Sequence, residues 1–280
     1  MKTEILYGIH PVTEALSARR RNIYEIYLQK ENKSGRLARL ASLADQRGIR
    51  VKTVRSGELM TMVSGGGHQG VAAKVDLYPL TAVSDILVAA EAKGRPHFLI
   101  ILDSVLDPQN LGAIIRSALC VGIDGVIMPK DRSAPITPAV SKASAGALEH
   151  INLSRVTNLV QTIKQCKNSG VWILGLDKDA ERSIYDGDMT GSIAIVLGGE
   201  QKGIRPLVKK NCDFLVSIPQ LGALDSLNAS VAAAVTMYEA LRQRQLNVEF
   251  GIRNAEKEMV DCLTFVFSTF RIPTSEFHGA

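Results

Sequence analysis

The chain has 280 residues, of which 46% are hydrophobic and 22% charged, so it is an ordinary globular sequence with room for one large or two modest domains. No apolar run approaches the roughly 18 residues of a membrane-spanning helix, and the first sixteen residues lack a signal-peptide pattern, which argues against a membrane or secreted protein and favours a cytoplasmic one. The net charge of +5 is concentrated in residues 1–77, where 13 basic residues stand against 7 acidic ones. That excess fits an anionic partner such as nucleic acid, or simply a solubilising surface.

Residues 1–77 are predicted to form a small α/β domain. Helical and strand-like patterns alternate along it, with helices over 8–17 and 35–47 and strands over 23–28, 49–54 and 70–77. A glycine-rich stretch from Ser64 to Gly70 either lets a ligand approach the backbone closely or simply connects two strands. Residues 78–96 contain a possible short helix over 83–92 and a Lys-Gly-Arg-Pro breaker, and are predicted to connect two domains.

From residue 97 to 246 the sequence predicts a second, larger α/β domain. Short continuous apolar strands alternate with helices, which is typical of a mostly parallel sheet covered on both faces. The strands are expected over 98–102, 125–128, 171–176, 193–197 and 214–218, and the helices over 111–121, 137–147, 157–169, 204–211 and 228–245. Ligands of such sheets bind outside the carboxyl ends of the strands, so the loops that follow the strands are the candidate functional segments.

Three of these loops have unusual sequences. The first, Asp107–Ala118, places Asn110 and Arg116 six residues apart on a helix, where they border one site only loosely; a capped helix with a surface arginine is the alternative. The second, Val196–Pro206, has glycines spaced GGxxxG with Glu200 between them. This is neither the GxGxxG of a nicotinamide-binding fold nor a P-loop, so those two classes are poorly supported. The third, Ile218–Ser230, leads through two helix-capping residue types into a helix of small residues.

The cysteines argue against a metal or disulfide scaffold. All four are separated by more than forty residues, so they form no CxxC knuckle, and we expect reduced thiols and no metal site.

In this order and spacing, the three loops resemble the signature motifs of the SpoU/TrmH family of SPOUT RNA ribose 2′-O-methyltransferases, over about residues 100–245. Two N-terminal segments, Tyr7–Val12 and His68–Val71, resemble the substrate-binding domain of the 23S rRNA guanosine-2′-O-methyltransferases within that family. The resemblance implies an L30e-like domain followed by a SPOUT domain with a C-terminal trefoil knot. It also implies a homodimer that uses S-adenosylmethionine to methylate a guanosine ribose in 23S rRNA, free or in a ribosome assembly intermediate.

The resemblance also implies roles for individual residues. The expected catalytic group is Asn110, Arg116, Glu200, Ser226 and Asn228, and the expected cofactor pocket is Leu176, Gly198, Gly199, Ile218 and Leu227. His10 and the run Arg19, Arg20, Arg21 are expected to contact RNA.

Arg116 is the family's proposed catalytic residue. A neutral arginine at pH 7 costs about 7–9 kcal/mol, so an electrostatic clamp on phosphate and developing alkoxide is preferred over a base, which remains the competing proposal. Asn110 and Asn228 are expected to orient the ribose or Arg116, and Ser226 to hold the motif backbone and the substrate. Glu200 is expected to fix Arg116 or another cation.

Three alternatives stay open. They are a tRNA 2′-O-methyltransferase, an antibiotic-resistance rRNA methylase of the same plan, and a catalytically silent RNA-binding factor, which the joint presence of the five catalytic-type residues disfavours. Residues 247–280, a weakly acidic extension with three phenylalanines, match no part of the family pattern, and their role is not predicted.

Overall fold

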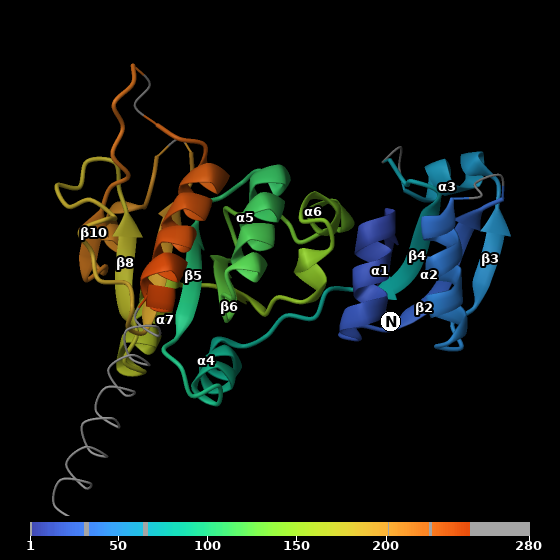
Figure 1. Cartoon of the computed structure of the whole chain (residues 1–280), viewed down its shortest axis with the longest axis horizontal. Helices are drawn as coiled ribbons and strands as arrows, with labels where there is room; N and C mark the ends of the chain where they lie inside the picture. Colours follow the sequence, from blue (N-terminus) through green and yellow to red (C-terminus); the bar gives the residue numbers. More distant parts are fainter. Residues whose placement is uncertain (1, 31–33, 64–66, 201, 224–225, 247–280) are drawn as a thin grey trace, which may run out of the picture.

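A computed structural model describes residues 2–30, 34–63, 67–200, 202–223 and 226–246, so the 247–280 extension lies outside the described part of the chain. Two α/β domains lie side by side along the long axis of the molecule (Figure 1). The N-terminal domain holds a four-stranded sheet and the C-terminal domain a six-stranded one.

The N-terminal sheet is mixed, with strand order β1-β4-β2-β3. Its strands are β1 (Thr3–Tyr7), β2 (Ile23–Gln29), β3 (Val51–Val54) and β4 (Val71–Asp76), and its helices are α1 (Ile9–Ala18), α2 (Gly35–Asp45) and α3 (Ser56–Met62). Helices α1 and α2 bury Leu16 and Leu40 against one face, whereas α3 inserts Leu59 against the other. The predicted helices and strands of this domain are confirmed to within a few residues. The sequence did not indicate β1 or α3.

The predicted connector over 78–96 is wrong in one respect, because most of it belongs to the C-terminal domain. It contains α4 (Val83–Glu91), whose Val83, Ile86 and Leu87 are buried in a core cluster with strand residues of the larger sheet. A Cβ added at Gly125 would lie 2.5 Å from the Ile86 side chain, so glycine there is what lets α4 approach the sheet. The stretch between the two domains is therefore short.

The C-terminal sheet is parallel throughout, in the order β10-β8-β9-β5-β6-β7. Its strands are β5 (Phe98–Asp103), β6 (Gly125–Pro129), β7 (Leu153–Val156), β8 (Trp172–Leu176), β9 (Ile193–Gly198) and β10 (Phe214–Val216). One face carries α5 (Pro108–Cys120), α6 (Pro138–Ala143) and a helix over residues 229–246; α4, α7 (Leu159–Asn168) and α8 (Pro206–Lys209) cover the other (Figure 1). Burial on both faces explains why the central strands read as unbroken apolar runs.

Three sequence predictions need correction in this domain. The edge strand β7 was not predicted, since its four residues have only two buried members. The helix predicted over 137–147 ends at Ala143 and is followed by a short 3-10 helix, η1 (Ala147–Glu149), and the helix predicted over 204–211 is reduced to the four residues of α8. Within the described ranges, no helix is both long and apolar enough to cross a bilayer.

The sheet order brings the three loop motifs together. Strand β5 is central, β9 lies directly beside it, and the loops that follow β5 and β9 therefore start at neighbouring positions on the same edge. The loop that follows β10 returns to this edge before the helix over 229–246 begins. This edge is where the topology places a ligand site.

Candidate active site

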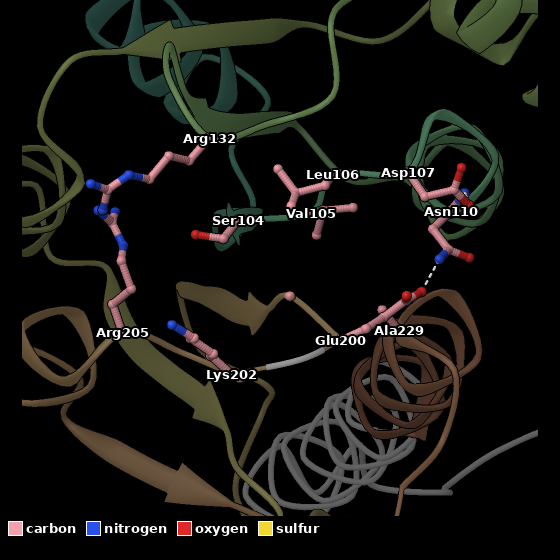
Figure 2. A pocket seen from close by; sticks show the side chains of 12 residues that line it. Ser104, Val105, Leu106, Asp107, Asn110, Arg132, Glu200, Lys202, Arg205 and Ala229 are labelled. Carbon is pink, nitrogen blue, oxygen red and sulfur yellow. Dashed lines mark hydrogen bonds between the residues drawn. The ribbon is translucent and has the colours of Figure 1, made fainter.

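Two cavities adjoin at the carboxyl ends of β5 and β9. The larger, about 650 Å³, is lined mainly by the loops after these two strands and is shown in Figure 2. The smaller, about 440 Å³, lies between the loops after β8, β9 and β10. Both fall in the usual size range of ligand pockets, about 300–1,000 Å³. Five residues line both cavities: Gly199, Glu200, Lys202, Gly203 and Ala229.

A chain of hydrogen bonds joins the three loop motifs at one end of the larger cavity. Asn228 donates through Nδ2 to Asn110 Oδ1 at 3.0 Å. Asn110 Nδ2 in turn donates to Glu200 Oε1, the bond drawn as a dashed line in Figure 2. Each asparagine makes one further hydrogen bond that fixes its position. The Asn110 backbone N–H donates to Asp107, which caps α5, and Asn228 Oδ1 accepts from the Ser230 N–H at 2.8 Å. One carboxylate oxygen of Glu200, Oε1, is therefore fixed by the bond from Asn110. Its other oxygen, Oε2, accepts no hydrogen bond from any described residue.

The opposite end of the larger cavity is basic. Arg132, Lys202 and Arg205 line it, facing Asn110 and Glu200 across the space in Figure 2. The sequence did not single out these three residues. Lys202 and Arg205 lie inside the second loop motif and could have been noticed there as cations next to glycines, whereas nothing in the sequence connected Arg132, which follows β6, to the site.

The smaller cavity collects all five residues expected to bind the cofactor. Leu176, Gly198, Gly199, Ile218 and Leu227 line it together with Ser226 and the carboxylates Asp177 and Asp179. Its glycines are sterically required, because a Cβ at Gly198 would lie 2.0 Å from the Gly203 backbone and one at Gly199 would lie 2.2 Å from the Ser104 carbonyl oxygen. The cavity therefore combines a closely folded glycine loop, apolar side chains and carboxylates.

Arg116 and Ser226 lie apart from the Asn110–Glu200–Asn228 group. Arg116 is exposed on α5 and lines neither cavity, and no described hydrogen bond or ion pair joins it to Glu200 or to the two asparagines, whose side chains bond to one another. Ser226 is exposed and borders the smaller cavity instead.

The arginine run of the N-terminal domain divides into residues with different roles. Arg21 is not available to RNA: its side chain is 2% exposed and forms a two-point ion pair with Glu149 of η1, at 2.8 and 2.6 Å. Arg20 is half-buried and donates to the Ile151 carbonyl oxygen and to the Tyr78 hydroxyl. Both arginines therefore hold the two domains together; the expectation that Arg21 binds RNA is wrong because its charge is buried and paired, and the guanidinium of Arg20 already donates to groups at this interface.

Other contacts complete this domain interface. Tyr78 donates to the Ile151 carbonyl oxygen, and burial raises the pKa of its phenol to about 12. A Cβ at Gly146 would lie 2.6 Å from the Glu14 side chain of α1, and His150 Nε2 lies 2.8 Å from a Glu14 carboxylate oxygen. The interface is thus closely packed as well as charged.

His10 and Arg19 remain exposed on the N-terminal domain. His10 lines a third cavity, about 510 Å³, between α1 and α2, together with Arg36 and Arg39. Desolvation, together with repulsion from the nearby charge of Arg19 at the end of α1, lowers the pKa of Arg47. No sequence motif singled out Arg36 and Arg39, although their spacing of three residues on a predicted helix places them on one face.

Comparisons with known proteins agree with this geometry. The family model described as "SpoU rRNA Methylase family" matches residues 97–238, and one described as "RNA 2′-O ribose methyltransferase substrate binding" matches residues 5–81. The 23S rRNA (guanosine-2′-O-)-methyltransferase RlmB of Coxiella burnetii is 42% identical over 87% of this chain and 97% of its own length. YacO of Bacillus subtilis, named as a TrmH family tRNA/rRNA methyltransferase, is 40% identical over 86% of this chain and 96% of its own length.

A solved structure shares the fold. The SpoU methyltransferase AviRb of Streptomyces viridochromogenes, crystallised in complex with AdoMet, superposes with a TM-score of 0.73 at 24% identity, covering 86% of this chain and 90% of AviRb.

Proposed function

The chain belongs to the SpoU rRNA methylase family, and from this premise we propose that it transfers a methyl group from S-adenosylmethionine to the ribose 2′-hydroxyl of a guanosine in 23S rRNA. The observation that carries the proposal is a pair of adjoining cavities that share lining residues. One is built from glycines and apolar side chains, and the other contains the oriented carboxylate of Glu200. The RlmB relative supports rRNA as the substrate. The tRNA in YacO's name supports a second candidate, a tRNA ribose 2′-O-methyltransferase.

The smaller cavity suits the proposed cofactor. Leu176, Ile218 and Leu227 offer apolar surface to an adenine ring, and the carboxylate of Asp179 suits a ligand that carries an ammonium and a sulfonium charge, whereas Asp177 is already ion-paired with Lys209. When bound there, S-adenosylmethionine supplies a methyl group on a positively charged sulfur, which keeps the bonding electron pair when the methyl–oxygen bond forms. Gly198 and Gly199 give the loop the close turn that this cavity needs.

The larger cavity would hold the target ribose at its Asn110–Glu200 end. We assign Glu200 Oε2 the task of accepting the hydrogen bond from the 2′-hydroxyl, which directs an oxygen lone pair toward the incoming methyl group and receives the proton as the new bond forms. Asn110 fixes the other carboxylate oxygen, and Asn228 fixes Asn110. Arg116, exposed on α5, is proposed as an electrostatic clamp on a phosphate of the bound RNA, rather than as a base.

The finer features implied by the resemblance are part of the same proposal. We propose that the chain is a homodimer, and the exposed Leu227, Val231 and Tyr238 around the helix over 229–246 provide apolar surface for a second copy. We also propose that the loops after β9 and β10 form a trefoil knot. The proposal further includes a cytoplasmic location and a ribosome assembly intermediate as the substrate. In the N-terminal domain, His10, Arg19, Arg36 and Arg39 would contact RNA phosphates from the α1–α2 side.

The test is methyl transfer from labelled S-adenosylmethionine to unmodified 23S rRNA and, separately, to bulk tRNA. We expect label at a ribose 2′-oxygen of 23S rRNA, with Glu200→Gln and Arg116→Ala as variants that lower the rate. Label only in tRNA would replace the leading substrate by the second candidate. Cofactor binding without transfer to either RNA, including ribosomal precursor particles, would contradict the enzyme assignment and favour a silent RNA-binding factor.

A further inference from the structure

We propose that Arg132, Lys202 and Arg205 form a binding site for an RNA phosphate next to the target ribose. This site, called here the phosphate wall, is the basic end of the larger cavity, and the inference rests on the proposed function because the phosphate belongs to the RNA substrate. The sequence motifs assign none of the three residues a role.

Two of the three cations of the phosphate wall have no carboxylate partner among the described residues, whereas the third, Arg205, is ion-paired with the buried Asp103. Arg132 and Lys202 are exposed, and no carboxylate in the described part of the chain lies within 4.0 Å of either. The acidic residues that line the cavity are at its other end, where Asp107 caps α5 and Glu200 Oε1 accepts from Asn110. A divalent anion at the basic end would therefore meet Arg132 and Lys202 without first displacing an internal partner.

Arg205 is held in a fixed direction. The Asp103 carboxylate, fully buried at the end of β5, accepts from the Arg205 backbone N–H at 2.9 Å and from its Nε at 2.7 Å. These two bonds leave the terminal nitrogens of the guanidinium without a hydrogen-bond partner among the described residues. Figure 2 shows the head groups of Arg205 and Arg132 turned toward each other, with Lys202 projecting into the space beside them. Planar guanidinium groups held in this way suit the oxygens of a phosphate.

Backbone strain also concentrates at this cavity. Five described residues other than glycine have a positive φ, and two of them, Ser104 (69°) and Arg132 (58°), line it. Such conformations cost about 1–3 kcal/mol each and persist where the surrounding structure demands them, typically at ligand sites. Arg132 is exposed, so packing in the core does not explain the positive φ of its backbone.

The anion is assigned to the RNA rather than to the cofactor because of where the residues lie. Arg132 and Arg205 line only the larger cavity, and Lys202 alone is common to both. The target ribose is proposed at the Asn110–Glu200 end of this same cavity, so an adjacent phosphate of the same strand would extend toward the basic end. Phosphate contacts of this kind position a nucleic acid without reading its sequence.

The experiment compares Arg132→Gln and Lys202→Gln with Lys164→Gln, which removes one exposed charge from α7 and lines neither cavity. Each full-length variant is assayed for kcat and KM with rRNA over a series of salt concentrations, and its affinity for S-adenosylmethionine is measured by calorimetry. We expect Arg132→Gln to raise KM on the order of 10-fold, to reduce the slope of log KM against log salt by about one, and to leave cofactor affinity unchanged within about 2-fold. Arg132→Lys should restore part of the loss, and Lys164→Gln should resemble the wild type.

Three outcomes would overturn the phosphate wall. They are an unchanged KM and salt slope in both variants, an equal change in Lys164→Gln, or a loss of cofactor affinity in place of RNA affinity. If the wild type itself transfers no methyl group to RNA, the proposed function fails. The phosphate wall is then tested by measuring equilibrium RNA binding of the same variants. If Arg132→Gln binds RNA as tightly as the wild type does, the phosphate wall is refuted.

Discussion

The ion pair between Arg21 and Glu149 gives the sharpest prediction about stability. Both side chains are almost fully buried, 2% and 1% exposed, and the Glu149 carboxylate also accepts from Ser141 Oγ at 2.7 Å. Arg21→Met removes the only cation that contacts this carboxylate in the described chain and leaves Glu149 buried without its partner. Breaking such a pair typically costs about 3–5 kcal/mol, and we expect the free energy of unfolding to fall by that amount.

The assay is urea unfolding, followed by far-UV circular dichroism for the whole chain and by fluorescence of Trp172, the chain's one tryptophan, for the C-terminal domain. The double variant Arg21→Met/Glu149→Gln should be less destabilised than Arg21→Met, because it removes the more deeply buried of the two carboxylates that pair with Arg21, Glu149 rather than Glu4, while the amide oxygen still accepts from Ser141. The matched control is Arg50→Met, whose guanidinium is 75% exposed and lies 3.9 Å from Glu25; it should change stability by less than about 0.5 kcal/mol. A loss below about 1 kcal/mol for Arg21→Met, or a double variant worse than the single, would refute the reasoning.

Three further predictions concern packing, the glycine loop and pH. Gly112→Ala places a Cβ 2.4 Å from α6 and should destabilise the chain by about 1–3 kcal/mol in urea unfolding, whereas Gly57→Ala, with open space around it in α3, should be neutral or stabilising. Gly198→Ala drives a Cβ into the Gly203 backbone and should abolish calorimetric binding of S-adenosylmethionine while RNA binding persists; normal cofactor binding would contradict the assigned cavity. Because the pKa of Tyr78 is raised from 10.0 to about 12, the stability that its protonated phenol contributes is present below pH 10 and is lost as pH rises toward 12, so Tyr78→Phe should flatten that part of a stability–pH curve.

The pattern of apolar residues was enough to predict most of the fold. The central strands β5, β6, β8 and β9 are buried on both faces and are bounded by glycine, proline or polar residues, so their periodicity is unambiguous. Edge strands carry a weaker signal, which is why β7 was missed. The 78–96 segment was misassigned because its proline and glycine suggest a linker, while the burial of α4 depends on Gly125, more than thirty residues away in the sequence.

The site was predictable only where a loop motif carried it. Asn110, Glu200 and Asn228 come from three distant segments, and their hydrogen-bond chain follows from the adjacency of β5 and β9, which the motifs imply but do not show. Arg21 shows the opposite case: three consecutive arginines indicate a basic surface, yet Glu149, 128 residues later, buries one of them. Local sequence does not determine whether a charge faces solvent or a distant counter-ion.

Gly199, Glu200, Lys202 and Gly203, in the loop after β9, line both cavities. A ligand in one cavity that shifts these shared residues changes the free energy of binding in the other, and the two affinities are then thermodynamically linked. That linkage is reciprocal: the factor by which the methyl donor tightens RNA binding must equal the factor by which RNA tightens binding of the methyl donor. The residues shared by the two cavities thus give this enzyme a route by which occupancy of one cavity changes the affinity of the other.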